Sequence, residues 1–462
     1  MNKRCDFLRA VDMTKGNILK QLVLFAIPIL LTNLLQNLYN AADSLMVGRF
    51  CDGNALAAVG TTESICNCLI GLFLGVGAGV SVIVSRAFGA GDVRKIHLAV
   101  HNGIALSVVC GIVVSVIGVI FAPLMLELMH VDLVIFDQAV LYLRIYFLGA
   151  VFLVIYNIGA GILRAIGDSR HPLIFLCVSA VTNIIMNYLF IKVFSLGVAG
   201  AAIATSVSQL LSSILVILTL VRSEGSHKLY LKEIRFEKES LLSSLKIGVP
   251  TGLQSMVISF SNVIIQTFVN SYGAAATAGS TAATKVDNFI LLISQSLSLA
   301  LMTFVGQNIG ANNVKRAKQG AAVSIGLSVA LMLLLGALAT VFRDSIVAIF
   351  VDKNDPNASE IIKYGALKVL FISLPYFIVG INDNLSSFLR AVGKATVPMV
   401  TYIVIMCVFR ILWIFFFRFW IPFIDTESLS SIFVVYPITF VLTAITLSVY
   451  YFMGTWKKII KN

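Results

Sequence analysis

The chain has 462 residues, of which 58% are hydrophobic and only 12% are charged. The charged share is about half of that in ordinary soluble proteins, and the mean hydropathy is +0.95. This composition excludes a soluble enzyme, a disordered chain and a nucleic-acid-binding protein. The formal net charge of +12 therefore indicates lysines and arginines gathered on the cytoplasmic side of a membrane.

Many apolar stretches are long enough to cross a membrane as helices, which takes about 20 residues each. The stretches are continuously apolar rather than alternating, which argues against a membrane β-barrel. The sequence therefore predicts an all-α membrane protein with twelve transmembrane helices. The predicted spans are 18–42, 56–85, 97–122, 138–163, 172–192, 197–221, 246–270, 276–305, 317–342, 361–389, 396–420 and 429–453.

Lysines and arginines are distributed unevenly over the predicted loops. With the N-terminus inside, 24 of them fall in inner segments and 8 in outer segments, with Lys363 and Lys368 counted as outer. The remaining two, Lys285 and Arg410, lie within spans. By the positive-inside rule, this bias predicts a multi-pass protein of the cell membrane with both termini in the cytoplasm.

The two halves of the chain repeat one another, at offsets of 222, 221 and 226 residues. Each copy holds six spans, an even number, so the copies have the same orientation. Parallel repeats of this kind place a transport path between two lobes. The matching segments are "FAIPILLTNLLQ" (25–36) with "IGVPTGLQSMVI" (247–258), "FGAGDVRKI" (88–96) with "IGANNVKRA" (309–317), and "LRAIGDSRHP" (163–172) with "LRAVGKATVP" (389–398).

The longest polar segment falls between these halves and predicts the domain boundaries. Residues 1–221 form the N-terminal six-helix lobe, 222–245 a solvated cytoplasmic linker, and 246–462 the C-terminal six-helix lobe. Pro28 and Pro250 occupy matching positions in the first helix of each lobe, where each removes a backbone donor and predicts a kink.

Four carboxylates lie within predicted spans, where a charge costs several kcal/mol or more and usually faces a cavity. Asp43 follows a dense run of hydrogen-bonding residues on the first helix. Asp287 lies two residues from Lys285, so the two cannot face each other on one helix. The residues predicted to line a substrate cavity are Gln36, Asn37, Tyr39, Asn40, Glu63, Gln254, Asp287 and Asp383.

The fifth span carries two asparagines that could form a polar group between helices. Asn183 and Asn187 are four residues apart and share one helix face, and Asn157 and Thr205 on neighbouring spans could join them. Hydrogen bonding between membrane helices is the alternative interpretation of these side chains.

Several common sites are not indicated. His97 and His101 have a metal-compatible spacing, but the sequence offers no evident third ligand, and no metal site is predicted. The seven cysteines include no CxxC pair and are assigned to packing. No phosphate-binding loop or Ser/His/Asp arrangement occurs, so no enzyme and no cofactor are expected. The glycines of the second span, Gly71, Gly75, Gly77 and Gly79, predict close helix packing.

Three segments of the chain resemble motifs of a known family. The segment "TKGNILKQLVLFAIPILLTNLLQNLYNAADSLMVGRF" is similar to the opening of multidrug and toxic compound extrusion (MATE) transporters. "LRAIGDSRHP" and its second copy resemble that family's paired cytoplasmic motifs, and "LGVAGAAIATSVSQ" at 196–209 resembles the start of its sixth span. The resemblance covers about 14–455, and the order of the motifs makes it specific.

This resemblance implies a V-shaped pair of lobes that exports small amphipathic, often cationic, compounds, driven by proton or sodium entry. The family's ion-coupling site falls on Asp43, Asn157, Asn183 and Thr205. Some members carry an aspartate where this chain has Asn187, so Asp43 would act alone there or with Glu63. We expect the protein to be surrounded by membrane lipid, to bind no nucleic acid and to be a monomer.

The sequence favours drug export over several other functions. A flippase for lipid-linked sugar precursors shares the wider architecture, but it would be expected to line its cavity with cations. Four acids against Lys285 and Arg410 within the spans favour cationic substrates instead. A membrane enzyme lacks a catalytic constellation, and a channel would be expected to oligomerise around a filter. A major-facilitator transporter would carry a longer Asp/Arg-rich motif than "SRAFGAGDVRK".

Overall fold

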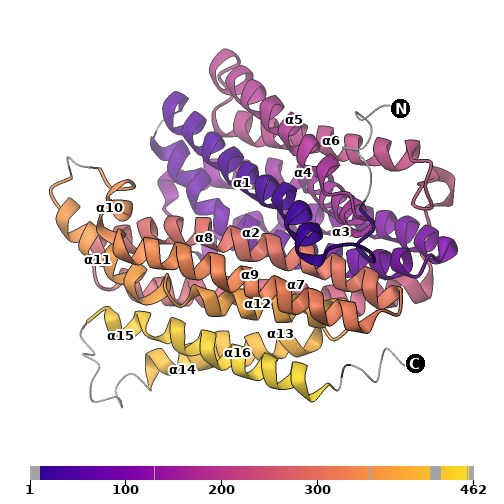
Figure 1. Cartoon of the computed structure of the whole chain (residues 1–462). Coiled ribbons are helices and arrows are strands. Elements are labelled where there is room, and N and C mark those ends of the chain that lie inside the picture. The colour runs from indigo at the N-terminus through magenta and orange to yellow at the C-terminus, as the bar shows by residue number, and fades with distance from the viewer. Residues whose placement is uncertain are drawn as a thin grey trace. The chain divides into compact units, whose positions relative to one another are not determined.

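The structure is a computed structural model, and it describes residues 11–51, 53–129, 131–352, 355–416, 428–454 and 456. Within these residues the regular elements are helices and no strand occurs, which confirms the all-α fold (Figure 1). The helices are α1 (Ile18–Phe50), α2 (Gly53–Gly89), α3 (Val93–Leu128), α4 (Leu133–Ala165), α5 (Arg170–Asn187), η2 (Tyr188–Val193), α6 (Gly197–Arg222), η3 (Leu231–Glu233), α7 (Lys238–Asn270), α8 (Ala274–Gly310), α9 (Val314–Val341), α10 (Arg343–Ala348), α11 (Ala358–Ile372), α12 (Tyr376–Ala391), α13 (Thr396–Tyr402), η4 (Ile403–Phe409), α14 (Arg410–Phe415), α15 (Ser430–Phe433) and α16 (Val435–Met453).

The described part of the chain contains eleven helices long and apolar enough to cross a membrane. A twelfth arises if α11 and α12, which are bent by 53° at a short break, form one span. This agrees with the twelve predicted spans, but the span predicted over 361–389 is a broken helix. Pro375 precedes α12, and a proline cannot donate the backbone hydrogen bond that would continue α11. By contrast, α1 and α7 continue through Pro28 and Pro250.

The repeated motifs form the same turns in both halves. Gly91 and Asn312, at matching positions of the first loop motif, both have positive φ angles, of 66° and 58°. Gly167 and Gly393, at matching positions of the second motif, have φ angles of 96° and 79°. Glycine and asparagine tolerate this region best, so the internal repeat read from the sequence is also a repeat of backbone conformation.

Asp92 shows how such a turn starts the next helix. Its side chain accepts a hydrogen bond from the backbone N–H of Lys95, 3.0 Å away, as an N-cap of α3. Capping satisfies a helix donor that would otherwise lack a partner. The same backbone contact holds the pKa of the Asp92 carboxyl below its usual value.

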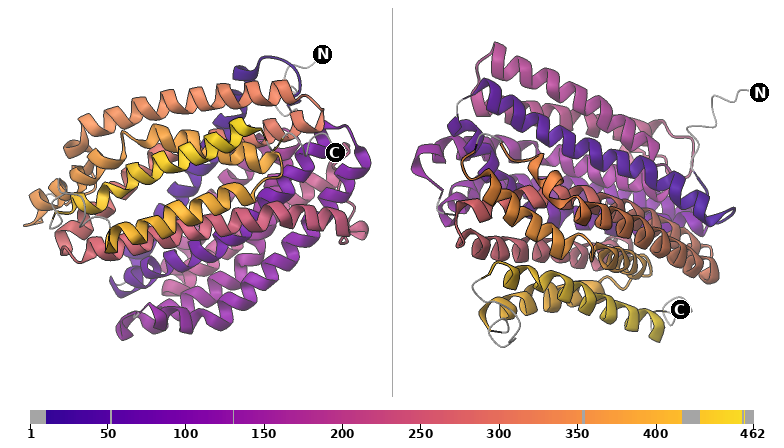
Figure 2. Two further views of the ribbon diagram at one scale, coloured as in Figure 1. Left: turned by 90° about the horizontal axis from the view of Figure 1, so that it is seen from below. Right: turned by 60° about the vertical axis from the view of Figure 1, so that its left-hand side comes forward.

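The chain divides into two compact units, which are described separately. The N-terminal unit comprises Met1–Gly16, Ile27–Gly252 and Gly306–Asn313. Within it, α4 packs against α2, α3 and α6, and these long helices run side by side (Figure 2). Their contact is an almost entirely apolar core that includes the fully buried Leu143, Phe147 and Ile158.

The C-terminal unit comprises Asn17–Ala26, Leu253–Val305 and Val314–Asn462. Here α12 packs against α9 and α16, and α11 packs against α15. One apolar core of this unit is built around Trp413, Ile432 and Phe433. In each unit one helix passes into a π-helical stretch, α5 into η2 and α13 into η4. Such stretches are rare and are often found at functional sites.

Glycines of α2 allow a close helix crossing within the N-terminal unit, as predicted. A Cβ added to Gly79 would lie 2.1 Å from the carbonyl oxygen of Ser244 on α7. A Cβ on Gly75 would lie 2.1 Å from the backbone nitrogen of Gly252. Both contacts are with backbone, which cannot rotate away as a side chain can. The α2–α7 crossing therefore requires glycine at both positions.

We expect the substitution Gly79→Val to destabilise the protein, by about 1–3 kcal/mol or more, because it overpacks a backbone contact. The measurement is the melting temperature of the purified protein in detergent. The matched control is Gly326→Val on α9, where an added Cβ meets nothing within 4 Å. Equal melting temperatures for the two variants would contradict the close-packing assignment.

Candidate functional site

Three helices of the N-terminal unit bring polar side chains around Asp43. Asp43 lies on α1 and is 8% exposed. The side-chain amide of Asn187, at the end of α5, donates to its Oδ1. The hydroxyl of Thr205 on α6 donates to its Oδ2 over 3.1 Å. A carboxylate in an apolar surrounding is stable only with such partners, and here each oxygen has one.

The hydrogen bonds continue away from Asp43 along the same helices. Asn187 also donates to Asn183 Oδ1 over 3.0 Å, and Asn183 Nδ2 donates to the Tyr39 hydroxyl over 3.1 Å. That hydroxyl lies 3.1 Å from Ser208 Oγ. The sequence analysis missed Ser208, although its position three residues after Thr205 places the two on one helix face. A continuous chain of polar groups therefore links α1, α5 and α6.

One oxygen of this cluster lacks a partner. Asn187 Oδ1 is buried and accepts no hydrogen bond, although the amide nitrogen of the same side chain makes two. An unpaired buried carbonyl oxygen costs about 1–3 kcal/mol. Together with the Asp43 carboxylate it forms an oxygen-rich site. Oxygen ligands suit hard cations, and a carboxylate also accepts a proton.

Other residues predicted for this site lie apart from it. The Asn157 amide donates to the backbone oxygen of Leu153 on its own helix, 2.8 Å away. Glu63 is exposed, as are Asn37 and Asn40. Gln36 is half-buried on α1. Their assignment to the coupling site or the substrate cavity stays a prediction.

The predicted residues of the C-terminal unit take part in separate contacts. Asp383 Oδ2 accepts from the Ser294 hydroxyl over 2.7 Å. Gln254 is 3% exposed and its Oε1 accepts from Arg390 Nη2 over 2.8 Å. Asp287 is 5% exposed, and its Oδ1 has no hydrogen-bond partner. These three positions therefore do not form one site in the manner of the Asp43 cluster.

The assignment of Lys368 to an outer segment is wrong. Lys368 lies on α11 and is 5% exposed. Its ammonium donates to Thr284 Oγ1 over 2.6 Å and to the carbonyl oxygen of Ser280 over 3.1 Å. It also acts electrostatically on Asp287. A lysine stem is long enough to carry its charge a full turn from its own backbone position, which a count of charges along the chain cannot show.

The structure also changes which basic side chains are buried in the predicted spans. Lys285, expected at membrane depth, is exposed and lies over the ring of Phe350 at 5.7 Å. In the part of the chain that the structure describes, the buried lysine and arginine side chains are Lys368 and Arg410, at 5% and 3% exposure. The expectation of four acids against Lys285 and Arg410 within the spans is therefore replaced by buried charges of both signs in the C-terminal unit.

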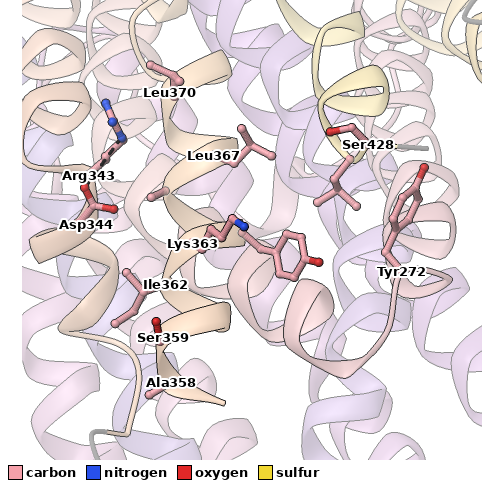
Figure 3. A pocket seen from close by; sticks show the side chains of 13 residues that line it. Tyr272, Arg343, Asp344, Ala358, Ser359, Ile362, Lys363, Leu367, Leu370 and Ser428 are labelled. Carbon is pink, nitrogen blue, oxygen red and sulfur yellow. Dashed lines mark ion pairs between the residues drawn. The ribbon is translucent and has the colours of Figure 1, made fainter. Parts of the chain in front are cut away.

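An open pocket of about 940 Å³ lies along α11 in the C-terminal unit, lined by residues from Ala358 to Leu370 of that helix (Figure 3). Arg343 and Asp344, whose charged atoms are 3.9 Å apart, lie on one side of it, with Tyr272 and Ser428 on the other and Lys363 between them. None of the residues that the sequence analysis assigned to the substrate cavity lines this pocket.

A His–His–Glu cluster joins the linker to α3. Glu233 of η3 comes within 2.9 Å of His97 Nε2, and the ligand atoms of His97, His101 and Glu233 lie within 4.8 Å of one another. Glu233 is the third group that the sequence analysis did not find. Imidazoles and a carboxylate are ligands that zinc accepts. However, His101 Nδ1 faces the carbonyl oxygen of His97 at 2.7 Å, and its Nε2 accepts from the Tyr230 N–H at 2.9 Å.

Since both ring nitrogens of His101 are engaged by backbone groups, the cluster acts as a latch for the linker. Leu229, next to this contact, is 1% exposed and belongs to the apolar core of the unit. The linker was expected to be solvated, and over this stretch it is packed. The reason is that the segment carries apolar side chains: Leu229 is buried in this core, and Ile234 packs against it.

Replacing His101 by phenylalanine should release the linker, because the Tyr230 N–H would lose its acceptor in a part-buried contact, at a cost of about 0.5–1.5 kcal/mol. The measurement is the rate of tryptic cleavage at Lys228 and Lys232 in the purified protein. Glu224→Gln, at an exposed linker position outside the cluster, is the control and should change the rate little. Equal cleavage of wild type and His101→Phe would argue against the latch.

Comparison with known proteins agrees with this architecture. The family described as MatE matches residues 28–189 and 250–416. The "Probable multidrug resistance protein YpnP" of Bacillus subtilis (strain 168) is 30% identical, over 97% of this chain and 98% of that protein. The "Multidrug export protein MepA" of Staphylococcus aureus (strain NCTC 8325 / PS 47) is 25% identical, over 82% and 83%. A solved structure, "Crystal structure of MATE in the bent conformation", has a TM-score of 0.88 at 21% identity, over 97% and 98% of the two chains.

These matches confirm the family resemblance and the fold of two six-helix lobes. They also confirm that the protein is not an enzyme. The chain belongs to the multidrug and toxic compound extrusion family and is a multi-pass membrane transporter of small molecules.

Proposed function

We propose that the protein exports amphipathic cations across the cell membrane by proton or sodium antiport with alternating access, acting as a monomer with both termini in the cytoplasm. The observation that carries this proposal is the enclosed Asp43 carboxylate, bonded by Asn187 and Thr205 beside the unpaired oxygen Asn187 Oδ1. The hydrogen-bond partners of Asp43 in the described residues are neutral. An entering cation is therefore the group that would complete the site.

The contacts of Asp43 explain how ion binding changes the helices. An ionised carboxylate only accepts hydrogen bonds, whereas a protonated one must also donate. Protonation of Asp43 would therefore weaken the hydrogen bond from Asn187 or from Thr205 to the protonated oxygen, and the new O–H would need an acceptor such as the unpaired Asn187 Oδ1. These partners lie on α5 and α6, while Asp43 lies on α1. Since Asp43 touches both helices, its ionisation state favours one of two arrangements of the three.

Sodium would act through the same oxygens. It would bind to Asp43 and to the unpaired Asn187 Oδ1, and Thr205 would turn its oxygen toward the ion. In either case a gradient drives transport only if the ion binds the two states of the lobe with different affinity. A substrate cation competes with the ion for the negative charge, which couples its release to ion entry.

A flippase for lipid-linked sugar precursors is the second candidate. The observation in its favour is the pair of buried cations Lys368 and Arg410, which a pyrophosphate-bearing substrate would require. Deletion of the gene separates the two functions. Accumulation of an anionic lipid precursor supports the flippase, and sensitivity to quaternary-ammonium or ethidium-like compounds supports the exporter.

Asp43→Asn should leave the protein folded and reduce gradient-driven efflux by about tenfold or more, because the group that binds the ion is removed. Asp43→Glu should keep part of the activity. Asn187→Asp should shift the pH dependence of efflux without abolishing it, because it adds a second ionisable group beside Asp43. The measurement is efflux from proteoliposomes against pH, with pH and sodium gradients imposed separately.

Asp137→Asn, an exposed acid on α4, is the matched control for the removal of a negative charge and should transport as wild type does. Wild-type efflux from Asp43→Asn would refute coupling at this site and would direct attention to Glu63, Asp287 and Asp383.

The proposed orientation predicts opposite labelling of two loops. In a cysteine-free background, a single cysteine at Asn357 should react with an impermeant reagent added outside intact cells. A cysteine at Ser226, in the linker, should react only after the cells are opened. Reaction of both from the outside would refute the twelve-span arrangement with cytoplasmic termini.

A further inference from the structure

The internal repeat assigns the first-span residues around Asp43 counterparts in the C-terminal unit. The offset of 222 residues that relates the first spans pairs Tyr39 with Ser261 and Asn40 with Asn262. The same offset pairs Asp43 with Ile265, which is 2% exposed within an apolar core. The carboxylate of the N-terminal site therefore has no counterpart on α7.

On the fifth span the difference is reversed, because the charged residue lies in the C-terminal unit. The offset of 226 residues that relates the motifs before these spans pairs Ile184, next to Asn183, with Arg410. Arg410 follows directly after η4 and is 3% exposed. The C-terminal unit thus has a cation on the span where the N-terminal unit has its asparagines.

Arg410 contacts the two helices that correspond to α1 and α6. Its Nη1 lies 3.3 Å from Asn262 Oδ1 and 3.5 Å from Ser261 Oγ, both on α7. Its Nε donates to Thr439 Oγ1 on α16 over 3.2 Å. The guanidinium also lies over the ring of Tyr436, 4.6 Å from its centre. First, fifth and sixth spans therefore meet around a charge in both units, negative in one and positive in the other.

The partners of Arg410 are all neutral. Among the described residues, no ion pair joins Arg410 to a carboxylate. The hydroxyls near it donate elsewhere, Ser261 to the carbonyl oxygen of Met406 and Thr439 to that of Val435. Long hydrogen bonds to neutral oxygens and one aromatic face offset only part of the cost of burying a cation, which is several kcal/mol.

The π-helical stretch η4 contributes a second observation. Met406 lies within η4, and its carbonyl oxygen accepts a hydrogen bond from the Ser261 hydroxyl on α7. This contact ties the irregular turn to the same helix that carries Asn262. Asn262 is exposed, so the guanidinium cluster reaches the surface of its unit at that residue.

We propose that the C-terminal unit binds a small monovalent anion at Arg410, between Asn262 on α7 and Thr439 on α16. The ligand is a halide or the carboxylate group of a zwitterionic substrate, since both offer a compact negative charge to one guanidinium. The site is distinct from the proposed coupling site at Asp43 and does not depend on it. In a transporter, it would admit substrates that carry a carboxylate as well as an amine, or require chloride.

Thermal melting of the purified full-length protein in detergent tests the site without a transport assay. Sodium chloride and sodium benzoate are titrated separately, with the bulky sulfonate MES as the replacement anion at constant ionic strength. The wild type should show a melting temperature that rises saturably with one of the two anions. A response to chloride identifies a halide site, and a response to benzoate identifies a carboxylate site.

Asn262 offers a matched pair of variants. Asn262→Asp has nearly the same shape and places a fixed carboxylate 3.3 Å from the guanidinium, so the anion response should weaken by about tenfold or more. Asn262→Ala removes the amide but leaves Arg410 unpaired, and the response should remain. Arg410→Gln should lose the response, whereas Asp43→Asn should keep it even if its efflux is abolished.

Two results would overturn the proposal. One is a wild-type melting temperature that shows no saturable dependence on either anion. The other is an equal anion response in Asn262→Asp and Asn262→Ala, which would show that Arg410 is held by Tyr436 and its neutral partners alone. If Arg410→Gln does not fold, the Asn262 pair decides the question by itself.

Discussion

A chain that crosses a hydrocarbon layer must satisfy its polar groups internally, because lipid offers neither hydrogen bonds nor charge screening. This constraint explains why the described residues are helical, and it makes each buried charge informative. Asp43 is stabilised by Asn187 and Thr205, and Lys368 by Thr284 and Ser280. The polar residues of the spans therefore connect helices by hydrogen bonds, and an ion or substrate that binds there can change those hydrogen bonds.

The repeat gives the two halves similar backbones with different chemistry. The turns at Gly91 and Asn312, and at Gly167 and Gly393, keep the same unusual backbone conformation. The charged positions do not, since Asp43 corresponds to Ile265 and the buried cation Arg410 corresponds to Ile184. A repeat of this kind preserves helix crossings, which depend on small residues and turns, while each half evolves its own polar groups. The coupling of ions and the recognition of substrate can then be divided between the lobes.

The packed linker and the broken helix pair α11 and α12 are two places where the structure departs from the predicted solvated linker and continuous span. Leu229 and Ile234 pack the linker onto the core of the N-terminal unit, and His101 accepts a hydrogen bond from the backbone N–H of Tyr230. Pro375 separates α11 from α12 because it cannot donate to the preceding turn. Each departure follows from a few residues whose effect is clear once their neighbours in space are known.

The sequence by itself determined the helical class, the number of spans, the repeat and the family, because apolar length, charge bias and motif spacing are properties of the chain read in order. Through the family resemblance it also grouped Asp43 with Asn157, Asn183, Asn187 and Thr205. Only the tertiary structure decided that Ser208 extends this group, that Asn157 bonds its own helix, and that Lys368 is buried. Those outcomes depend on which helix faces meet and how far a side chain reaches across them, and neither is encoded in the local pattern of residues.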